Sequence, residues 1–162
     1  MVRARGSGLE SGFAFGLVRQ LFERRLALAG EGERAALLAG PAAAVRPLLA
    51  GEAPVQPADD GSFAVLHGLY WLVVNLAAGR PLLVAVDDAH WADEPSLRWL
   101  AYLAPRLEGL AAGMLVAMRP GDPVTRCTFP SCCGRLSSAA GRWPRWSLLS
   151  CWPEGWRESR GG

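Results

Sequence analysis

The sequence has no lysine, so each of its 17 basic residues is an arginine. Chemistry that needs an ammonium side chain is therefore excluded from these 162 residues, including a Schiff base and the phosphate-binding lysine of a P-loop. Isoleucine is also absent, and Asn75 is the single asparagine. Because lysine, isoleucine and asparagine have AT-rich codons, we expect the gene to come from a GC-rich genome.

Long apolar runs are absent as well. The longest run, 63–78, spans about 16 residues and contains His67 and Asn75, whereas a transmembrane helix needs about 20. The start of the chain lacks the layout of a secretory signal, because Arg19 interrupts a short apolar stretch. A net charge of +2 predicts no strong attraction to nucleic acid or to membranes. We therefore expect a cytoplasmic protein that contacts neither.

Apolar residues make up 51% of the chain, which is enough for one buried core. Helical periodicity predicts helices over 13–28, 31–38, 63–78 and from about 94 to 107. Phe13 begins the apolar face of the first helix. Ser62 is the expected N-cap of the third helix and Gly79 its end, and either Asp93 or Ser96 caps the fourth.

Short apolar runs at 82–87 and 114–118 show no alternation of polar and apolar residues. This pattern predicts strands that are covered on both faces, as in a parallel sheet. Residues 1–5 are expected to form the end of another strand. Helices that alternate with such strands through short connections indicate an α/β fold.

The last part of the chain, 124–162, differs from the rest. It holds four of the seven tryptophans, all four cysteines and six arginines, but only two acidic residues. Neither a helical nor a strand period is present. We therefore expect domain 1–123 to be followed by an irregular tail over 124–162, produced by a frameshift near 124–127 or disordered by nature.

The segment LLVAVDDAHWAD, residues 82–93, carries the strongest chemical signal. It places Asp87 and Asp88 at the carboxyl end of a predicted strand, the edge where open α/β sheets bind ligands. Carboxylates there favour Mg²⁺, which takes a few carboxylate contacts together with waters and phosphates. This is the pattern of a Walker B element at 82–88, although two solvated aspartates in a surface turn would have the same spacing.

The segments RARGSGLESGFAFGLVRQLFE, SFAVLHGLYWLVVNLA, RPLLVAVDDAHWADEPSLRWLAYLAPRLEGL and LVAMRPGDP together resemble one family. It is the nucleotide-binding domain of the large ATP-binding regulators of the LuxR type, which are AAA-like, signal-transduction-type P-loop ATPases. The resemblance implies a partial P-loop NTPase sheet. In the family order 5-1-4-3-2, residues 1–5, 82–87 and 114–118 would be strands 2, 3 and 4.

The resemblance also implies roles for individual residues and for ATP with Mg²⁺ as the cofactor. Asp87 would be the acid on the magnesium side, and Asp88 would polarise the attacking water, with one methylene less than glutamate. Arg119 would sense the γ-phosphate, since a guanidinium suits a polyanion; alternatively it is an ordinary arginine before a turn. His90 and Trp91 belong to the motif without an assigned chemistry, and His90 is expected to be a packed or capping residue.

The family's phosphate loop and its C-terminal helix-turn-helix have no counterpart in these residues. We therefore expect a fragment that neither binds nor hydrolyses ATP alone, with the phosphate loop encoded shortly upstream. The alternatives are a truncated product without function and a non-catalytic module whose helices 13–28 and 63–78 dock to other domains of the parent regulator. Without strand 1, the edge of the strand at 114–118 would be exposed and promote self-association.

Overall fold

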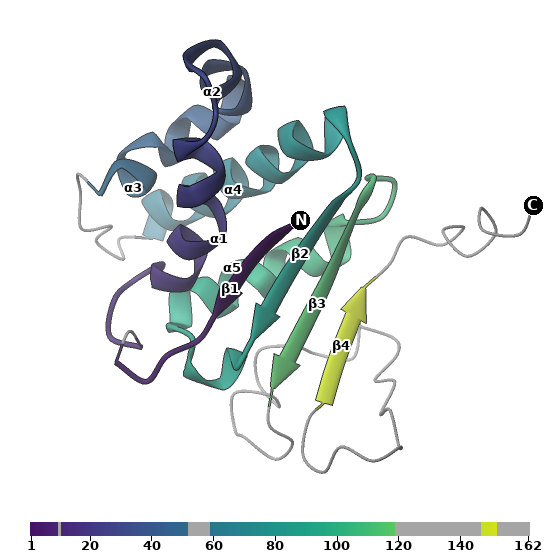
Figure 1. Ribbon diagram of the computed structural model, residues 1–162. Coiled ribbons are helices and arrows are strands. Elements are labelled where there is room, and N and C mark those ends of the chain that lie inside the picture. Colours follow the sequence, from purple (N-terminus) through teal and green to yellow (C-terminus); the bar gives the residue numbers. More distant parts are fainter. Residues whose placement is uncertain (10, 52–58, 119–146, 152–162) are drawn as a thin grey trace, which may run out of the picture.

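The segments predicted as strands pair in one sheet. The computed structural model describes residues 1–9, 11–51, 59–118 and 147–151 (Figure 1). Strands β1 (Val2–Arg5), β2 (Leu82–Asp87) and β3 (Ala112–Met118) are parallel and adjacent in this order, which confirms the expected α/β fold and places β2 in the centre. All three carboxyl ends therefore lie at the same edge of the sheet.

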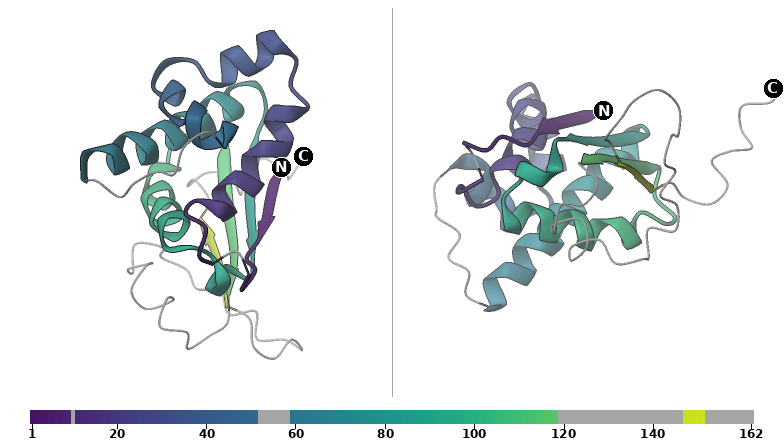
Figure 2. Two further views of the ribbon diagram at one scale, coloured as in Figure 1. Left: turned by 90° about the vertical axis from the view of Figure 1, so that its left-hand side faces the viewer. Right: turned by 90° about the horizontal axis from the view of Figure 1, so that it is seen from below.

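The sheet is fully covered on one face. Along β2, buried residues alternate with half-buried ones, so Val84 and Val86 lie on the covered face and Ala85 and Asp87 on the other. Helices α4 (Asp59–Gly79) and α5 (Glu94–Leu103) lie against the covered face (Figure 2). The expectation of strands covered on both faces was therefore wrong for the described residues, because small and apolar residues on the second face concealed the alternation.

A fourth strand, β4 (Ser147–Cys151), pairs antiparallel with β3. It lies in the segment that we expected to be irregular, and its residues carry no period from which a strand could be predicted. The edge of β3 that we expected to be open therefore carries these five residues. The rest of the proposed tail lies outside the described residues.

The remaining elements connect the strands. In chain order they are α1 (Gly16–Ala27), α2 (Glu31–Leu37), the 3-10 helix η1 (Gly40–Val45), α3 (Arg46–Ala50), α4, η2 (Ala89–Trp91), α5 and η3 (Ala104–Arg106). The four predicted helices correspond to α1, α2, α4 and α5. Among the described residues, no helix combines the length and the hydropathy that a bilayer span requires.

Two helix starts differ from the prediction. Helix α1 begins at Gly16, so Phe13 precedes it and is 67% exposed rather than part of the core. Helix α4 begins at Asp59, so Ser62 lies within the helix and is not its N-cap. The apolar pattern from which this helix was predicted begins at Phe63, so it does not include the turn that precedes it.

The core forms where α1, α4 and α5 meet the covered face of the sheet. Trp99 of α5 is fully buried and packs edge-on against Phe22 of α1, with ring centroids 5.6 Å apart and planes at 78°. Offset and edge-to-face aromatic pairs of this kind add to the energy of area burial. The contact joins the helix that follows β1 to the helix that follows β2.

Candidate functional site

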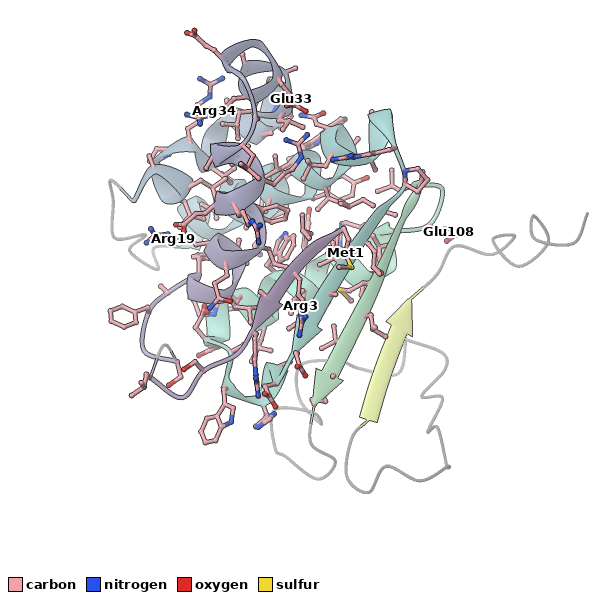
Figure 3. All side chains as sticks on the ribbon, viewed as in Figure 1. Met1, Arg3, Arg19, Glu33, Arg34 and Glu108 are labelled. Carbon is pink, nitrogen blue, oxygen red and sulfur yellow. The ribbon has the colours of Figure 1, made fainter. Side chains whose placement is uncertain are left out.

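The site is built at the carboxyl edge of the parallel sheet. Asp87 is the last residue of β2 and lies opposite Arg5, the last residue of β1. Two residues earlier, Arg3 lies opposite Ala85. Because side chains alternate along a strand, Arg3, Arg5 and Asp87 share the face of the sheet that α4 and α5 leave open. Figure 3 shows Arg3 on β1 beside β2.

Asp87 is the accessible carboxylate of the pair. Its side chain is 38% exposed, and Oδ2 lies 4.0 Å from a guanidinium nitrogen of Arg3. Oδ1 accepts a hydrogen bond of 3.0 Å from the backbone N–H of Asp88. A half-exposed carboxylate of this kind can take part in Mg²⁺ coordination, which leaves room for waters and phosphate oxygens.

Asp88 is buried, although it immediately follows Asp87. Its backbone is left-handed, with φ 50° and ψ 39°, and the residue is 6% exposed. This turn directs the carboxylate toward β1, where Oδ2 accepts a hydrogen bond of 2.8 Å from Nε of Arg5. A charge-assisted hydrogen bond compensates the cost of burying the carboxylate.

Arg5 is the counter-ion that sequence reasoning missed. Its hydrogen bond to Asp88, and then the negative charges of Asp88 and Asp87, raise the pKa of the guanidinium above its ordinary value. Its backbone N–H donates to the side chain of Gln20 in α1, which covers the outer edge of β1. The signal that could have identified Arg5 is its register: in a parallel sheet, the ends of residues 1–5 and 82–87 must meet.

A close backbone approach joins the segment after β1 to the site. The N–H of Gly6 donates to the carbonyl oxygen of Asp87 at 2.9 Å. A Cβ atom at position 6 would clash with the carbonyl oxygen of Asp88. Glycine is therefore required here because two backbone segments touch, whereas the sequence indicated only a loop at residues 6–8.

His90 and Trp91 form part of η2, directly after the aspartates. Their rings are in contact, with centroids 5.3 Å apart, and His90 is half-buried. This arrangement agrees with the expected packed histidine. Trp91 is 45% exposed and lies beside Gly8, so it covers the segment that follows β1.

Not all of the predicted site residues belong to the part of the chain that the structure describes. Arg119 lies outside the described residues, so its role as a sensor remains a prediction. Within the described residues, no group of three or more histidine, cysteine or acidic side chains is arranged to hold a metal ion. The structure thus brings together Asp87 and Asp88, and adds Arg3 and Arg5 to them.

One comparison with known proteins gives a match. A family model described as an AAA ATPase domain matches residues 2–116. This range begins at β1, includes both aspartates and ends within β3. Among curated proteins and among solved structures, none matches the chain.

Proposed function

The chain belongs to the AAA ATPase domain family, and from this membership we propose that it carries the magnesium-binding side of an ATP-binding module in a cytoplasmic LuxR-type regulator. One observation carries the proposal: Asp87 ends the central strand of a parallel sheet, half-exposed at the edge where open α/β sheets bind ligands. The regulator assignment is supported by the resemblance of the four sequence segments described above.

The donor set fits Mg²⁺ in part. Asp87 offers an accessible carboxylate, and Mg²⁺ commonly uses one or two carboxylates while keeping waters and substrate phosphates as its other ligands. Asp87 would hold the ion, directly or through water. Bound Mg²⁺ would supply positive charge to the phosphate oxygens of ATP.

Asp88 has the position expected of a water-polarising acid, but its carboxylate is not free to orient a water molecule. To orient a water molecule, the carboxylate needs an oxygen that faces the reacting phosphate. In this structure Oδ2 is engaged with Arg5 and the side chain is buried. The catalytic role therefore requires that the hydrogen bond between Arg5 and Asp88 breaks or that the second carboxylate oxygen of Asp88 orients the water.

The phosphate side of the module is not provided by these residues. A P-loop binds phosphates through a glycine-rich cradle of amides and a lysine, and the sequence contains no lysine. The cations nearest to the site, Arg3 and Arg5, face Asp87 and Asp88. We infer that these 162 residues alone neither bind nor hydrolyse ATP.

A titration of the isotopically labelled chain with Mg²⁺, followed by NMR, tests the proposal. We expect weak binding with the largest shifts at the amides of Asp87 and Asp88. Asp87→Asn should abolish these shifts, whereas Glu108→Gln, which removes an exposed acid between η3 and β3, should leave them unchanged. Shifts that persist in Asp87→Asn, or no shifts in the wild type, contradict the magnesium site.

ATP supplies the second arm of this test. Calorimetry with ATP and Mg²⁺ should give no binding, and phosphate release should equal that of the buffer. Binding in the micromolar range, about 8 kcal/mol of free energy, would show that the chain has a phosphate site of its own and would overturn the second half of the proposal.

A second candidate function is docking to other domains of the same regulator. The observation that favours it is Phe63 of α4, which is 60% exposed and stacks on His67 with ring centroids 5.7 Å apart. Phe63 also meets the ring of Tyr102 of α5 at 6.2 Å. If this surface docks, Phe63→Ser should weaken capture of the purified remaining domains. Leu9→Ser, which changes a still more exposed apolar residue outside both helices, should not.

A further inference from the structure

Asp93 connects two helices that begin far apart in the sequence. Its Oδ1 accepts hydrogen bonds from the backbone N–H groups of Phe15 at 2.7 Å and Ser96 at 2.9 Å, and its Oδ2 accepts one from Leu17 at 3.2 Å. The residue is 4% exposed. A carboxylate only accepts hydrogen bonds, and three donors suit its two oxygens.

These donors belong to the starts of two helices. Ser96 lies in the first turn of α5, for which Asp93 is the N-cap, whereas Phe15 and Leu17 lie at the start of α1. Free N–H groups and the positive end of the helix dipole favour a negative charge at both places. The side chain of Ser96 reinforces the joint by accepting from the N–H of Val18 at 3.2 Å.

The two segments joined by Asp93 contain the strained backbone of the described chain. Among the described residues, Phe15 and Asp88 are the non-glycine residues with positive φ, at 58° and 50°. Such conformations cost energy and persist where the surroundings enforce them. Phe15 is fixed by its hydrogen bond to Asp93, and Asp88 by its pair with Arg5.

The same two segments also meet at the aspartate pair. Gly6 donates to the carbonyl of Asp87, and Gly8 lies against the Trp91 ring. The chain that leaves β1 is therefore fastened to the chain that leaves β2 at two places, first beside Asp87 and then at Asp93. Between these places, the turn that carries Asp88 has little freedom to move without the segment opposite.

We propose that Asp93 is a positioning residue, which locks the start of α1 to the turn after β2 and thereby fixes the Asp87–Asp88 pair. Its role goes beyond capping α5, since two of its three bonds lead to α1. The part that concerns magnesium rests on the proposed function. The mechanical part, the joint between the two segments, stands on the hydrogen bonds alone.

The Asp93→Ser variant distinguishes the N-cap role of Asp93 in α5 from its hydrogen bonds to the start of α1. Serine is a good N-cap, so the bond to the Ser96 N–H is retained, but a single hydroxyl oxygen cannot also reach Phe15 and Leu17. Amide hydrogen exchange of the 162-residue chain, followed by NMR, should be about tenfold faster or more at Phe15 and Leu17 and nearly unchanged at Ser96. The amides of Gly6 and Trp91 should also exchange faster.

Two further variants serve as controls. Ser96→Ala removes the bond to Val18 without touching the carboxylate, so acceleration should be confined to Val18. Glu94→Gln removes the charge of the neighbouring exposed acid and should leave all of these amides unchanged. Wild-type exchange at Phe15 and Leu17 in Asp93→Ser, or equal acceleration across the whole chain, overturns the proposal.

The same samples are titrated with Mg²⁺. If Asp93 only caps α5, the magnesium shifts in Asp93→Ser should equal those of the wild type, because serine retains the cap. If Asp93 positions the aspartate pair, the shifts at Asp87 and Asp88 should be displaced and the magnesium affinity of Asp93→Ser should fall severalfold. The thermal unfolding midpoints of Asp93→Ser and Ser96→Ala should lie close together. If the wild type shows no magnesium shifts, the proposed function fails, while the exchange rates still decide whether Asp93 is the joint.

Discussion

The guanidinium of Arg5 holds the carboxylate of Asp88 at 2.8 Å, across two neighbouring strands and 83 positions of sequence. Asp88 is the residue that the family resemblance assigns to water activation, and here its charge is already paired. Asp87, directly before it, keeps an accessible oxygen. The two aspartates of one motif thus have different surroundings, set by a left-handed backbone at Asp88 that turns its side chain toward β1.

Removing this cation should affect stability and metal binding in opposite directions. Arg5→Ala leaves the buried Asp88 carboxylate without its counter-charge, so the chain should unfold at a lower temperature than the wild type. The loss of a positive charge beside the aspartates should also tighten Mg²⁺ binding severalfold. Thermal denaturation and the NMR titration measure both effects. Arg24→Ala, an exposed arginine of α1, is the matched control and should change neither.

A methyl group at position 6 should separate the two segments of the site. In Gly6→Ala the new Cβ meets the carbonyl oxygen of Asp88, and backbone atoms cannot rotate away as a side chain can. We expect a loss of about 1–3 kcal/mol in the free energy of unfolding, as for other overpacked positions. Urea denaturation measures it. Gly12→Ala, where the added methyl meets open space, should cost much less; equal losses would refute the close approach.

The contact between Trp99 and Phe22 should be a main source of stability. Trp99 is fully buried, and truncating a core tryptophan to alanine typically costs about 3–5 kcal/mol. Trp99→Ala should therefore unfold at a far lower urea concentration than the wild type. Trp91→Ala, which removes a tryptophan that is 45% exposed, should cost a small fraction of this. Similar costs for the two variants would mean that the core lies elsewhere.

A pH effect is expected from the ion pair that joins α1 to α2. The hydrogen bond from Arg25 is the main cause that lowers the pKa of Glu33 below its ordinary value of 4.5. Because the folded state holds the carboxylate ionised, the stabilisation is complete above pH 4.5 and is lost as the pH falls through the lowered pKa. The effect should be small, since Glu33 lies at the surface of α2 (Figure 3).

Denaturation midpoints measured between pH 7 and pH 3 test this pair. Glu33→Gln should flatten the fall in stability below about pH 4.5. Arg25→Gln, which removes the partner that lowers the pKa of Glu33, should flatten the profile in the same pH range. A Glu33→Gln profile that is parallel to the wild type would show that the pair contributes nothing.

Local patterns in the sequence were sufficient for the three parallel strands and for the motif, but not for β4. Strand β2 was predicted at its observed bounds, 82–87. A short apolar run that ends in two aspartates indicates a strand of the sheet, with its carboxyl end at the point where the aspartates begin. The order of the three parallel strands agreed with the family resemblance. The position of Asp87 and Asp88 at the carboxyl edge followed from the same run.

The partners of these residues were decided by the tertiary structure. The periodicity placed the start of the first helix at Phe13, but α1 begins at Gly16, where Asp93, from more than 70 positions away, accepts from the first amides. Arg5 likewise meets Asp88 only when β1 and β2 pair in register. A sequence pattern records which face of an element is buried, since burial follows its period. Which donor meets which acceptor depends on how elements far apart in the chain pack, and no local period contains that information.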